Sequence, residues 1–137
     1  MANDTRPLPS LDEPDTGPFW RATKDHDLRY QQCNDCDTIV FYPRRHCTGC
    51  LGLNLTWHTS AGHGVIYSFS VVVLSRDPAF SDNVPYAIAL VDLDEGFRMF
   101  TNITGIDDPL TDIQIGQRVT VDWEDHEELA IPNFRPA

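Results

Sequence analysis

Four cysteines, the only ones in the chain, form two Cys-x-x-Cys pairs within the stretch CNDCDTIVFYPRRHCTGC. Cys33 pairs with Cys36 and Cys47 with Cys50. Each pair can turn two sulfurs toward one point, and the linker can bring both pairs together as a tetrahedral four-thiolate site. Because four protein ligands leave no open position for substrate or water, such a site is structural. The pattern predicts a structural zinc ion.

Other interpretations of the cysteines stay open. The same four ligands can hold iron in a rubredoxin-like site, and buried free thiols are a further alternative. His46 lies beside Cys47 and offers a competing ligand, although four cysteines already satisfy the metal. No secretory signal is recognisable, and no stretch approaches the roughly 18 apolar residues of a transmembrane helix. We therefore expect a cytoplasmic protein with no membrane partner, whose cysteines are metal ligands rather than disulfides.

Arg44 and Arg45 lie between the cysteine pairs and are the only adjacent basic residues in the chain. One interpretation is a solvated tip of the ribbon. The other is a contact with phosphate, because guanidinium groups bind phosphate oxygens in bidentate geometry.

Catalytic motifs are missing from the sequence. It contains no G-x-S-x-G elbow, no Gly-rich phosphate loop and no His-Glu-x-x-His. We expect the acidic residues Glu124, Asp125, Glu127 and Glu128 to form a solvated loop rather than an acid/base pair. We therefore predict no catalytic residue and no independent catalysis. A net charge of −11, from 21 acidic and 10 basic residues, also disfavours nucleic acid as a partner.

The order of local patterns predicts a mainly β protein in three parts. A proline-rich, polar stretch predicts a flexible arm at residues 1–17. A short helix ending near Asp27 and a rubredoxin-like zinc ribbon follow at 18–53; the ribbon is too small to build its own core, so a metal must hold it together. Residues 54–137 are expected to form a five-stranded OB-fold barrel with a C-terminal tail.

The barrel is predicted from alternating segments and turn signals. RVTVDWE alternates, with Val119, Val121 and Trp123 expected to face inward. YAIALVDL and FRMFTNI are joined through Gly96, which can take the positive φ of a tight hairpin. About five strands favour a closed barrel over an immunoglobulin-like sandwich, which requires about seven.

Taken together, the chain resembles the family of proteins with a rubredoxin-like zinc ribbon followed by an OB-fold, long catalogued as a domain of unknown function and associated with acyl-CoA metabolism. The resemblance covers about residues 18–137. The matching stretches are GPFWRA, LRYQQC, CNDCDTIVFYPRRHCTGC, GVIYSFSVV, PYAIALVDLDEGFRMFTNI, IGQRVTVDWE and IPNFRPA. One departure is Asp37, where the family often has glycine; aspartate also tolerates the left-handed conformation that a knuckle turn needs.

This resemblance implies a non-catalytic accessory subunit in a hetero-oligomer with a thiolase-like protein. The partner would be an aldolase or thiolase acting on an acyl-CoA, including steroid side-chain retro-aldolases, and this chain would stabilise it and help form the site for the coenzyme A thioester. The four cysteines carry over as zinc ligands, and Arg44 and Arg45 as a weaker contact with a coenzyme A phosphate. The aromatic residues Phe41, Tyr42 and Phe134 are expected to be exposed anchors of the interface.

Two other function classes remain as alternatives. One is a single-stranded nucleic-acid-binding protein, since ribbons and barrels occur in such proteins, although the acidity opposes it. The other is a stand-alone acyl-CoA-binding protein or hydrolase, which turnover by the purified chain would support.

Overall fold

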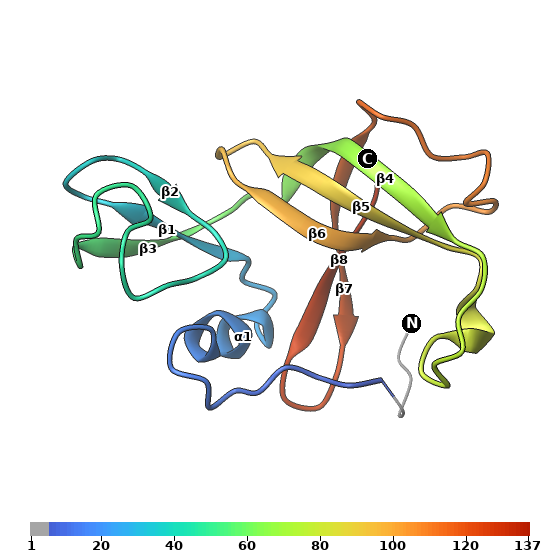
Figure 1. The fold of residues 1–137 in the computed structure, drawn as a ribbon, viewed down its shortest axis with the longest axis horizontal. Coiled ribbons are helices and arrows are strands. Elements are labelled where there is room, and N and C mark those ends of the chain that lie inside the picture. Colours follow the sequence, from blue (N-terminus) through green and yellow to red (C-terminus); the bar gives the residue numbers. More distant parts are fainter. Residues whose placement is uncertain (1–5) are drawn as a thin grey trace.

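The computed structural model describes residues 6–137, which form a small zinc-ribbon-like sheet beside a larger barrel (Figure 1). The elements are α1 (Gly17–Thr23), β1 (Arg29–Cys33), β2 (Ile39–Val40), β3 (Leu55–Thr59), β4 (His63–Val72), the 3-10 turn η1 (Ser81–Asn83), β5 (Tyr86–Leu93), β6 (Arg98–Ile103), β7 (Arg118–Asp125) and β8 (Ala130–Pro136). No helix among the described residues is long and apolar enough to cross a membrane.

The smaller sheet has the order β2-β1-β3 and is antiparallel throughout. Strand β1 pairs with β3 along its whole length, from Arg29 opposite Thr59 to Cys33 opposite Leu55. The chain enters the barrel almost directly after β3, because β4 begins at His63. The boundary expected between residues 53 and 54 stays a prediction, but β3 belongs by its pairing to the sheet that carries the cysteines.

The larger sheet closes into a barrel with the order β4-β5-β6-β8-β7. Four of its contacts are antiparallel and one is parallel, where Ile103 of β6 lies opposite Phe134 of β8. The β5–β6 hairpin turns at Gly96, whose φ of 104° is the positive value that the sequence predicted. The predicted mainly β fold, with a short helix, a ribbon and a five-stranded OB-fold barrel, is confirmed.

Two expectations about the strands need correction. The C-terminal stretch expected as a tail forms β8, which pairs with β7 and completes the barrel. Its two prolines, Pro132 and Pro136, hide this strand in the sequence because proline donates no hydrogen bond to a sheet ladder. Phe134, expected as an exposed anchor, is fully buried instead.

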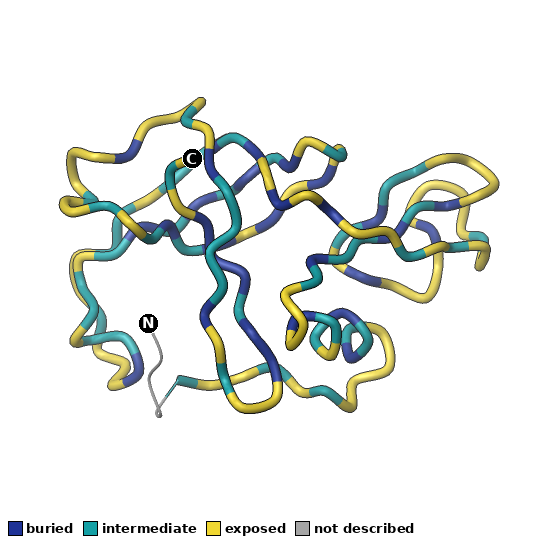
Figure 2. Tube along the Cα trace, turned by 180° about the vertical axis from the view of Figure 1, so that it is seen from behind, coloured by how far each residue is buried: buried dark blue, intermediate teal, exposed yellow. Residues whose placement is uncertain are grey.

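The barrel interior is filled by one face of each strand, as the alternation predicts. Strand β5 alternates strictly between half-buried and buried residues, and its buried face is small and aliphatic. Figure 2 shows buried residues alternating with more exposed ones along the barrel strands. The most deeply buried barrel side chains are Ile66, Ala87, Val91, Val119 and Phe134.

An aromatic cluster joins α1, the ribbon and the barrel. The ring centroid of Phe41 in the ribbon lies 5.6 Å from that of Phe19 in α1 and 4.7 Å from that of Phe97 in the barrel. Tyr30 of β1 stacks on the same Phe97 at 5.0 Å. Phe41 is therefore half-buried at this joint rather than an exposed anchor. Aromatic pairs in such contacts contribute more stabilising free energy than the burial of their surface alone. The cluster therefore fixes the position of the ribbon on the barrel.

The N-terminal region differs from the expectation in two ways. The helix ends at Thr23, one turn before the predicted Asp27, and the Thr23 hydroxyl accepts a hydrogen bond from the backbone N–H of Ala130 at 3.0 Å. Of the flexible arm expected at residues 1–17, residues 1–5 lie outside the described part. In the remainder, Arg6 forms a 2.6 Å ion pair with Glu124 of β7.

The position of Phe134 gives a prediction about stability. Substitution Phe134→Ala should lower the free energy of unfolding by about 3 to 5 kcal/mol, because it leaves a cavity where β6, β7 and β8 meet. Urea denaturation followed by tryptophan fluorescence measures the loss. The neighbouring Arg135→Ala is the control, since Arg135 is exposed on the same strand. A loss below about 1 kcal/mol for Phe134→Ala would show that β8 does not close the core.

Candidate metal centre and interaction surfaces

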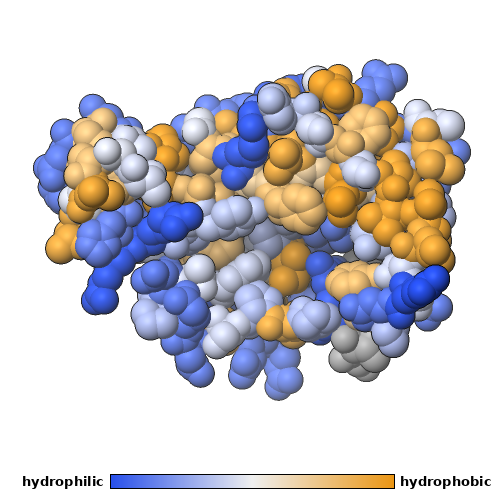
Figure 3. All heavy atoms as spheres, viewed as in Figure 1, coloured by the Kyte–Doolittle hydropathy of each residue, from blue (hydrophilic) through white to orange (hydrophobic). Residues whose placement is uncertain are grey.

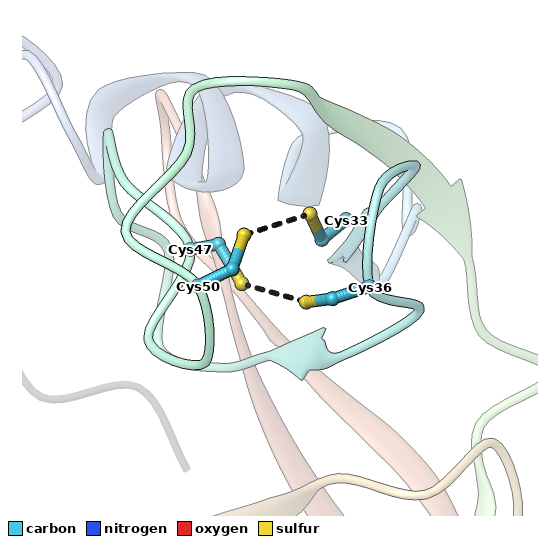
Figure 4. A group of neighbouring side chains, drawn as sticks. All are labelled: Cys33, Cys36, Cys47 and Cys50. Carbon is cyan, nitrogen blue, oxygen red and sulfur yellow. Dashed lines mark hydrogen bonds between the residues drawn. The ribbon is translucent and has the colours of Figure 1, made fainter.

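The four cysteine sulfurs converge at one end of the smaller sheet (Figure 4). All four sulfurs lie within 4.8 Å of one another, with Cys33 and Cys50 at 3.7 Å and Cys36 and Cys47 at 3.5 Å. A disulfide would require about 2.05 Å between sulfurs. Ligands of a tetrahedral zinc ion, at about 2.3 Å from the metal, lie about 3.8 Å apart. The donor set and its spacing therefore fit a four-coordinate metal.

Both cysteine pairs use the same turn. The N–H of Asp37 bonds to the carbonyl of Cys33, and the N–H of Leu51 bonds to the carbonyl of Cys47, each at 3.0 Å. Asp37 and Leu51 both adopt a left-handed conformation, with φ of 63° and 64°. Asp37 thus takes the left-handed conformation that was expected at this position. Leu51 is the less expected residue, because a branched side chain disfavours positive φ.

The surroundings of the sulfurs favour thiolates in part. Backbone N–H groups of Cys50 and Gly49 lower the pKa of Cys47 to about 6. The Thr38 hydroxyl lowers the pKa of Cys36. At Cys50 the N–H of Gly52 acts to lower the pKa, but the neighbouring sulfurs outweigh it and raise the pKa to about 12. Four thiolates this close repel one another, and a bound dication would remove that repulsion.

The loop between the cysteine pairs is held by a residue that the sequence analysis did not single out. Gln31 of β1 is buried, and its side-chain amide bonds to both the N–H and the carbonyl of Arg44, at 2.8 and 2.9 Å. No sequence motif identifies this contact, because it joins residues on different segments. The backbone of the loop is therefore fixed while its side chains extend outward.

The loop side chains are available to a partner. Arg44, Arg45 and His46 are exposed, and among the described residues no ion pair engages either arginine. His46 is not one of the residues whose ligand atoms meet the sulfur cluster. The structure therefore leaves Arg44 and Arg45 free to contact a phosphate but shows no such ligand.

The outer surface of β4, β5 and β6 carries a group of apolar side chains, with Ser68, Ser70 and Asn102 beside them on the same side. Leu90 of β5 lies opposite Phe100 of β6. Ile88 lies two residues before Leu90, so its side chain is on the same side of β5. Phe100 is 57% exposed and Tyr67 of β4 is 51% exposed. We call Tyr67, Ile88, Leu90 and Phe100 the outer apolar face. Figure 3 shows hydrophobic side chains gathered over these strands and the segment that follows β4.

The outer apolar face is extended at both ends. Val73 and Leu74, directly after β4, are 63% and 71% exposed. At the other end Tyr42 of the ribbon is half exposed, and its hydroxyl accepts a hydrogen bond from the N–H of Phe100 at 2.8 Å. Of the three aromatic anchors expected from the sequence, Tyr42 alone is exposed. Exposed apolar side chains that cluster on a folded domain are characteristic of interaction sites, which makes this surface a candidate for one.

Glu124 does not lie in a solvated loop as expected. It is buried, and it accepts a bond of 2.6 Å from Arg6 and is joined to His126 at 2.6 Å. Burial acts to raise the pKa of Glu124, but His126 and Arg6 hold that pKa below its usual range. The expectation failed here because one partner of Glu124, Arg6, lies far away in the sequence and no local pattern reveals it. Asp125, Glu127 and Glu128 are exposed, as expected.

Family models match both parts of the chain. The ChsH2 rubredoxin-like zinc ribbon domain matches residues 20–56. The ChsH2 C-terminal OB-fold domain matches residues 57–124.

The chain is also similar to curated proteins. A probable enoyl-CoA hydratase alpha subunit of Thermomonospora curvata is 38% identical over 96% of this chain and 40% of its own length. The 3-oxo-4,17-pregnadiene-20-carboxyl-CoA hydratase alpha subunit of Mycobacterium tuberculosis is 32% identical over 81% of this chain and 35% of its own length. A DUF35 domain-containing scaffold protein of Methanocaldococcus jannaschii is 33% identical over 73% of this chain and 70% of its own length. The chain thus spans two fifths or less of the two hydratase subunits.

A solved structure extends the similarity to the whole chain. The match is to a chain of the Ltp2-ChsH2(DUF35) aldolase, with a TM-score of 0.82 and 36% identity. It covers 96% of this chain and 98% of that one. The two-part fold, the cysteine cluster and these similarities lead to one conclusion: the chain belongs to the DUF35 family and is built from a ChsH2-type zinc ribbon and OB-fold.

Proposed function

We propose that this protein is a non-catalytic accessory subunit, which binds and stabilises a thiolase-fold aldolase or thiolase and helps form its acyl-CoA site. The outer apolar face is the observation that carries this proposal. The names of the similar proteins support the coarser part, since they describe hydratase subunits, an aldolase complex and a scaffold protein. The two hydratase names specify a CoA substrate, and the aldolase and scaffold names describe an enzyme complex and a scaffold, so together they support a partner subunit of an acyl-CoA-processing enzyme.

The finer parts of the proposal have separate support. A steroid acyl group is suggested by the name of the mycobacterial relative, and an aldolase partner by the similarity to a chain of the Ltp2-ChsH2(DUF35) aldolase. Four free thiols in paired knuckles suit the reducing cytoplasm, where we place the protein.

The four cysteines, in this proposal, hold a structural zinc ion. Cys33, Cys36, Cys47 and Cys50 supply all four ligands, so the metal contributes shape and stability rather than chemistry. This role fits the rest of the ribbon, whose own buried cluster contains only Cys33, Val40 and Cys47, with Leu55 packed beside them. Iron in the same site is distinguished by elemental analysis.

Arg44 and Arg45 are the residues that we assign to a phosphate of coenzyme A. Their guanidinium groups are exposed on a loop whose backbone Gln31 holds in place. With a net charge of −11 the rest of the chain repels phosphate, so the partner must supply the remaining positive charge.

The metal proposal is tested with Cys33→Ser. This variant should lose its zinc, because three remaining thiolates bind far more weakly than four, and the ribbon should unfold while the barrel stays folded. Elemental analysis by plasma mass spectrometry measures the metal, and ¹H–¹⁵N NMR spectra report the two parts separately. His46→Ala is the matched control and should keep one zinc per chain. Full zinc content in Cys33→Ser would contradict the assignment.

The docking proposal is tested with Phe100→Asp. Co-expression with the proposed thiolase-like partner should give a stable complex, and the charge should weaken that complex about 30-fold or more. Binding is measured by isothermal titration calorimetry after size-exclusion chromatography. Ile115→Asp, at an apolar residue that is 70% exposed on the loop before β7, should bind normally. Separate elution of the unmodified proteins, or equal binding by both variants, would rule out this interface.

The phosphate assignment is tested by kinetics of the complex. Replacing Arg44 and Arg45 together by alanine should raise the KM for the coenzyme A thioester about tenfold and leave kcat nearly unchanged, since only ground-state binding is lost. Arg76→Ala, at another exposed arginine, is the control. A KM within about twofold of the unmodified complex would leave the pair as a solvated tip.

A further inference from the structure

A cavity of about 350 Å³ opens on the barrel where the segment before β5, the connection after β6 and the N-terminal segment meet. This size is within the range of small-molecule sites. Figure 1 shows the start of the described chain close to η1, and Arg6 indeed lies 5.8 Å from the ring of Phe80. A second cavity of about 200 Å³ shares Arg6, Asn102 and Asn133 with the first.

Three asparagine side chains line the larger cavity: Asn83, Asn102 and Asn133. Within residues 6–137, the side-chain amide of Asn133 makes no hydrogen bond, although the residue is only 3% exposed. Among the described residues, every side-chain nitrogen or oxygen that is closed off from solvent has a hydrogen-bond partner. Because the Asn133 amide has none, it must be open to the cavities that Asn133 lines. The amides of Asn83 and Asn102 also make no hydrogen bond within the described chain.

These amides are a set of unused donors and acceptors on the cavity wall. Each asparagine offers two N–H donors and one carbonyl acceptor. Water that enters the cavity can bond to these amides, so a ligand that displaces it must reproduce those hydrogen bonds. The ligand must therefore present both donors and acceptors, as an amide group does.

The charges in the cavity do not favour an anionic ligand. Arg6 is the cation in the wall, and it is already paired with Glu124 at 2.6 Å. Asp122 also lines the cavity and accepts a hydrogen bond from the Thr104 hydroxyl. Among residues 6–137 the wall thus carries one positive and two negative side chains, a balance that does not favour phosphates or carboxylates over uncharged ligands.

The remaining wall is apolar and partly aromatic. Phe80 and Tyr86, whose ring centroids lie 6.1 Å apart, face the cavity together with Ile103 and Ile106. These side chains suit the apolar body of a ligand, preferably a flat one, since aromatic faces stack on planar groups.

We propose that this cavity binds an uncharged organic molecule that joins an amide group to an apolar, planar body. Asn133 and Asn102 bond to the amide, and Phe80 and Tyr86 contact the apolar body. The inference does not depend on the proposed accessory function, because every residue of the site belongs to this chain.

The proposal is tested with benzamide as the probe and with the full, zinc-loaded chain. Titration followed by ¹H–¹⁵N NMR should give saturable shifts of the Asn133 side-chain amide signals and of β8, with a Kd of about 1 to 10 mM for so small a probe. Benzoate, which has the same shape with a negative charge, should bind at least about tenfold more weakly. Saturable shifts confined to other parts of the chain, or equal binding of benzoate, would overturn the proposal.

Variants show whether the amides carry the binding. Asn133→Leu keeps the number and branching of the side-chain heavy atoms and should weaken benzamide binding about tenfold, as expected for the loss of one or two hydrogen bonds. Asn102→Leu, at a half-buried position, gives the same test if Asn133→Leu does not fold. Gln114→Leu removes an exposed amide elsewhere and should change nothing. Unchanged affinity in the folded asparagine variants would refute the site.

Discussion

The meeting of four sulfurs is the constraint on which the rest of the structure depends. The ribbon has almost no core of its own, since its buried cluster contains two of the cysteines and one valine. A segment of this size cannot offset the entropy of ordering its loops by hydrophobic burial alone. The sulfurs, within 4.8 Å of one another, replace that core. Losing them would release Phe41 and Tyr30, which are two of the ribbon's contacts with the barrel.

Those contacts turn a local constraint into a fixed surface. Phe41 and Tyr30 of the ribbon pack against the ring of Phe97. The backbone N–H of Phe100 donates a hydrogen bond to the Tyr42 hydroxyl. The loop that carries the two arginines and the outer apolar face are therefore parts of one rigid unit. A preformed surface loses little entropy on binding, which suits a subunit whose task is to hold another protein.

Local patterns in the sequence predicted much of this fold. The cysteine spacing identified the ribbon, and Gly96 identified the β5–β6 hairpin, because each depends on residues close together in the chain. Long-range pairings were not predictable in the same way. The prolines of β8 disguised the strand that closes the barrel, and one partner of Glu124 is Arg6, 118 residues away in the sequence. The same holds for the candidate sites. The cysteine spacing predicted the four candidate metal ligands, but no sequence motif points to Gln31 or to the asparagines of the cavity.

The central claim is that this chain contributes structure rather than catalysis to an enzyme acting on an acyl-CoA. Turnover of the acyl-CoA should be measured for the purified chain alone, for the thiolase-like partner alone and for the two mixed in equal amounts. The account predicts no turnover by the chain, weak or no turnover by the partner, and full activity only in the mixture. Turnover by the chain alone, or a partner whose activity is the same with and without it, would contradict the account.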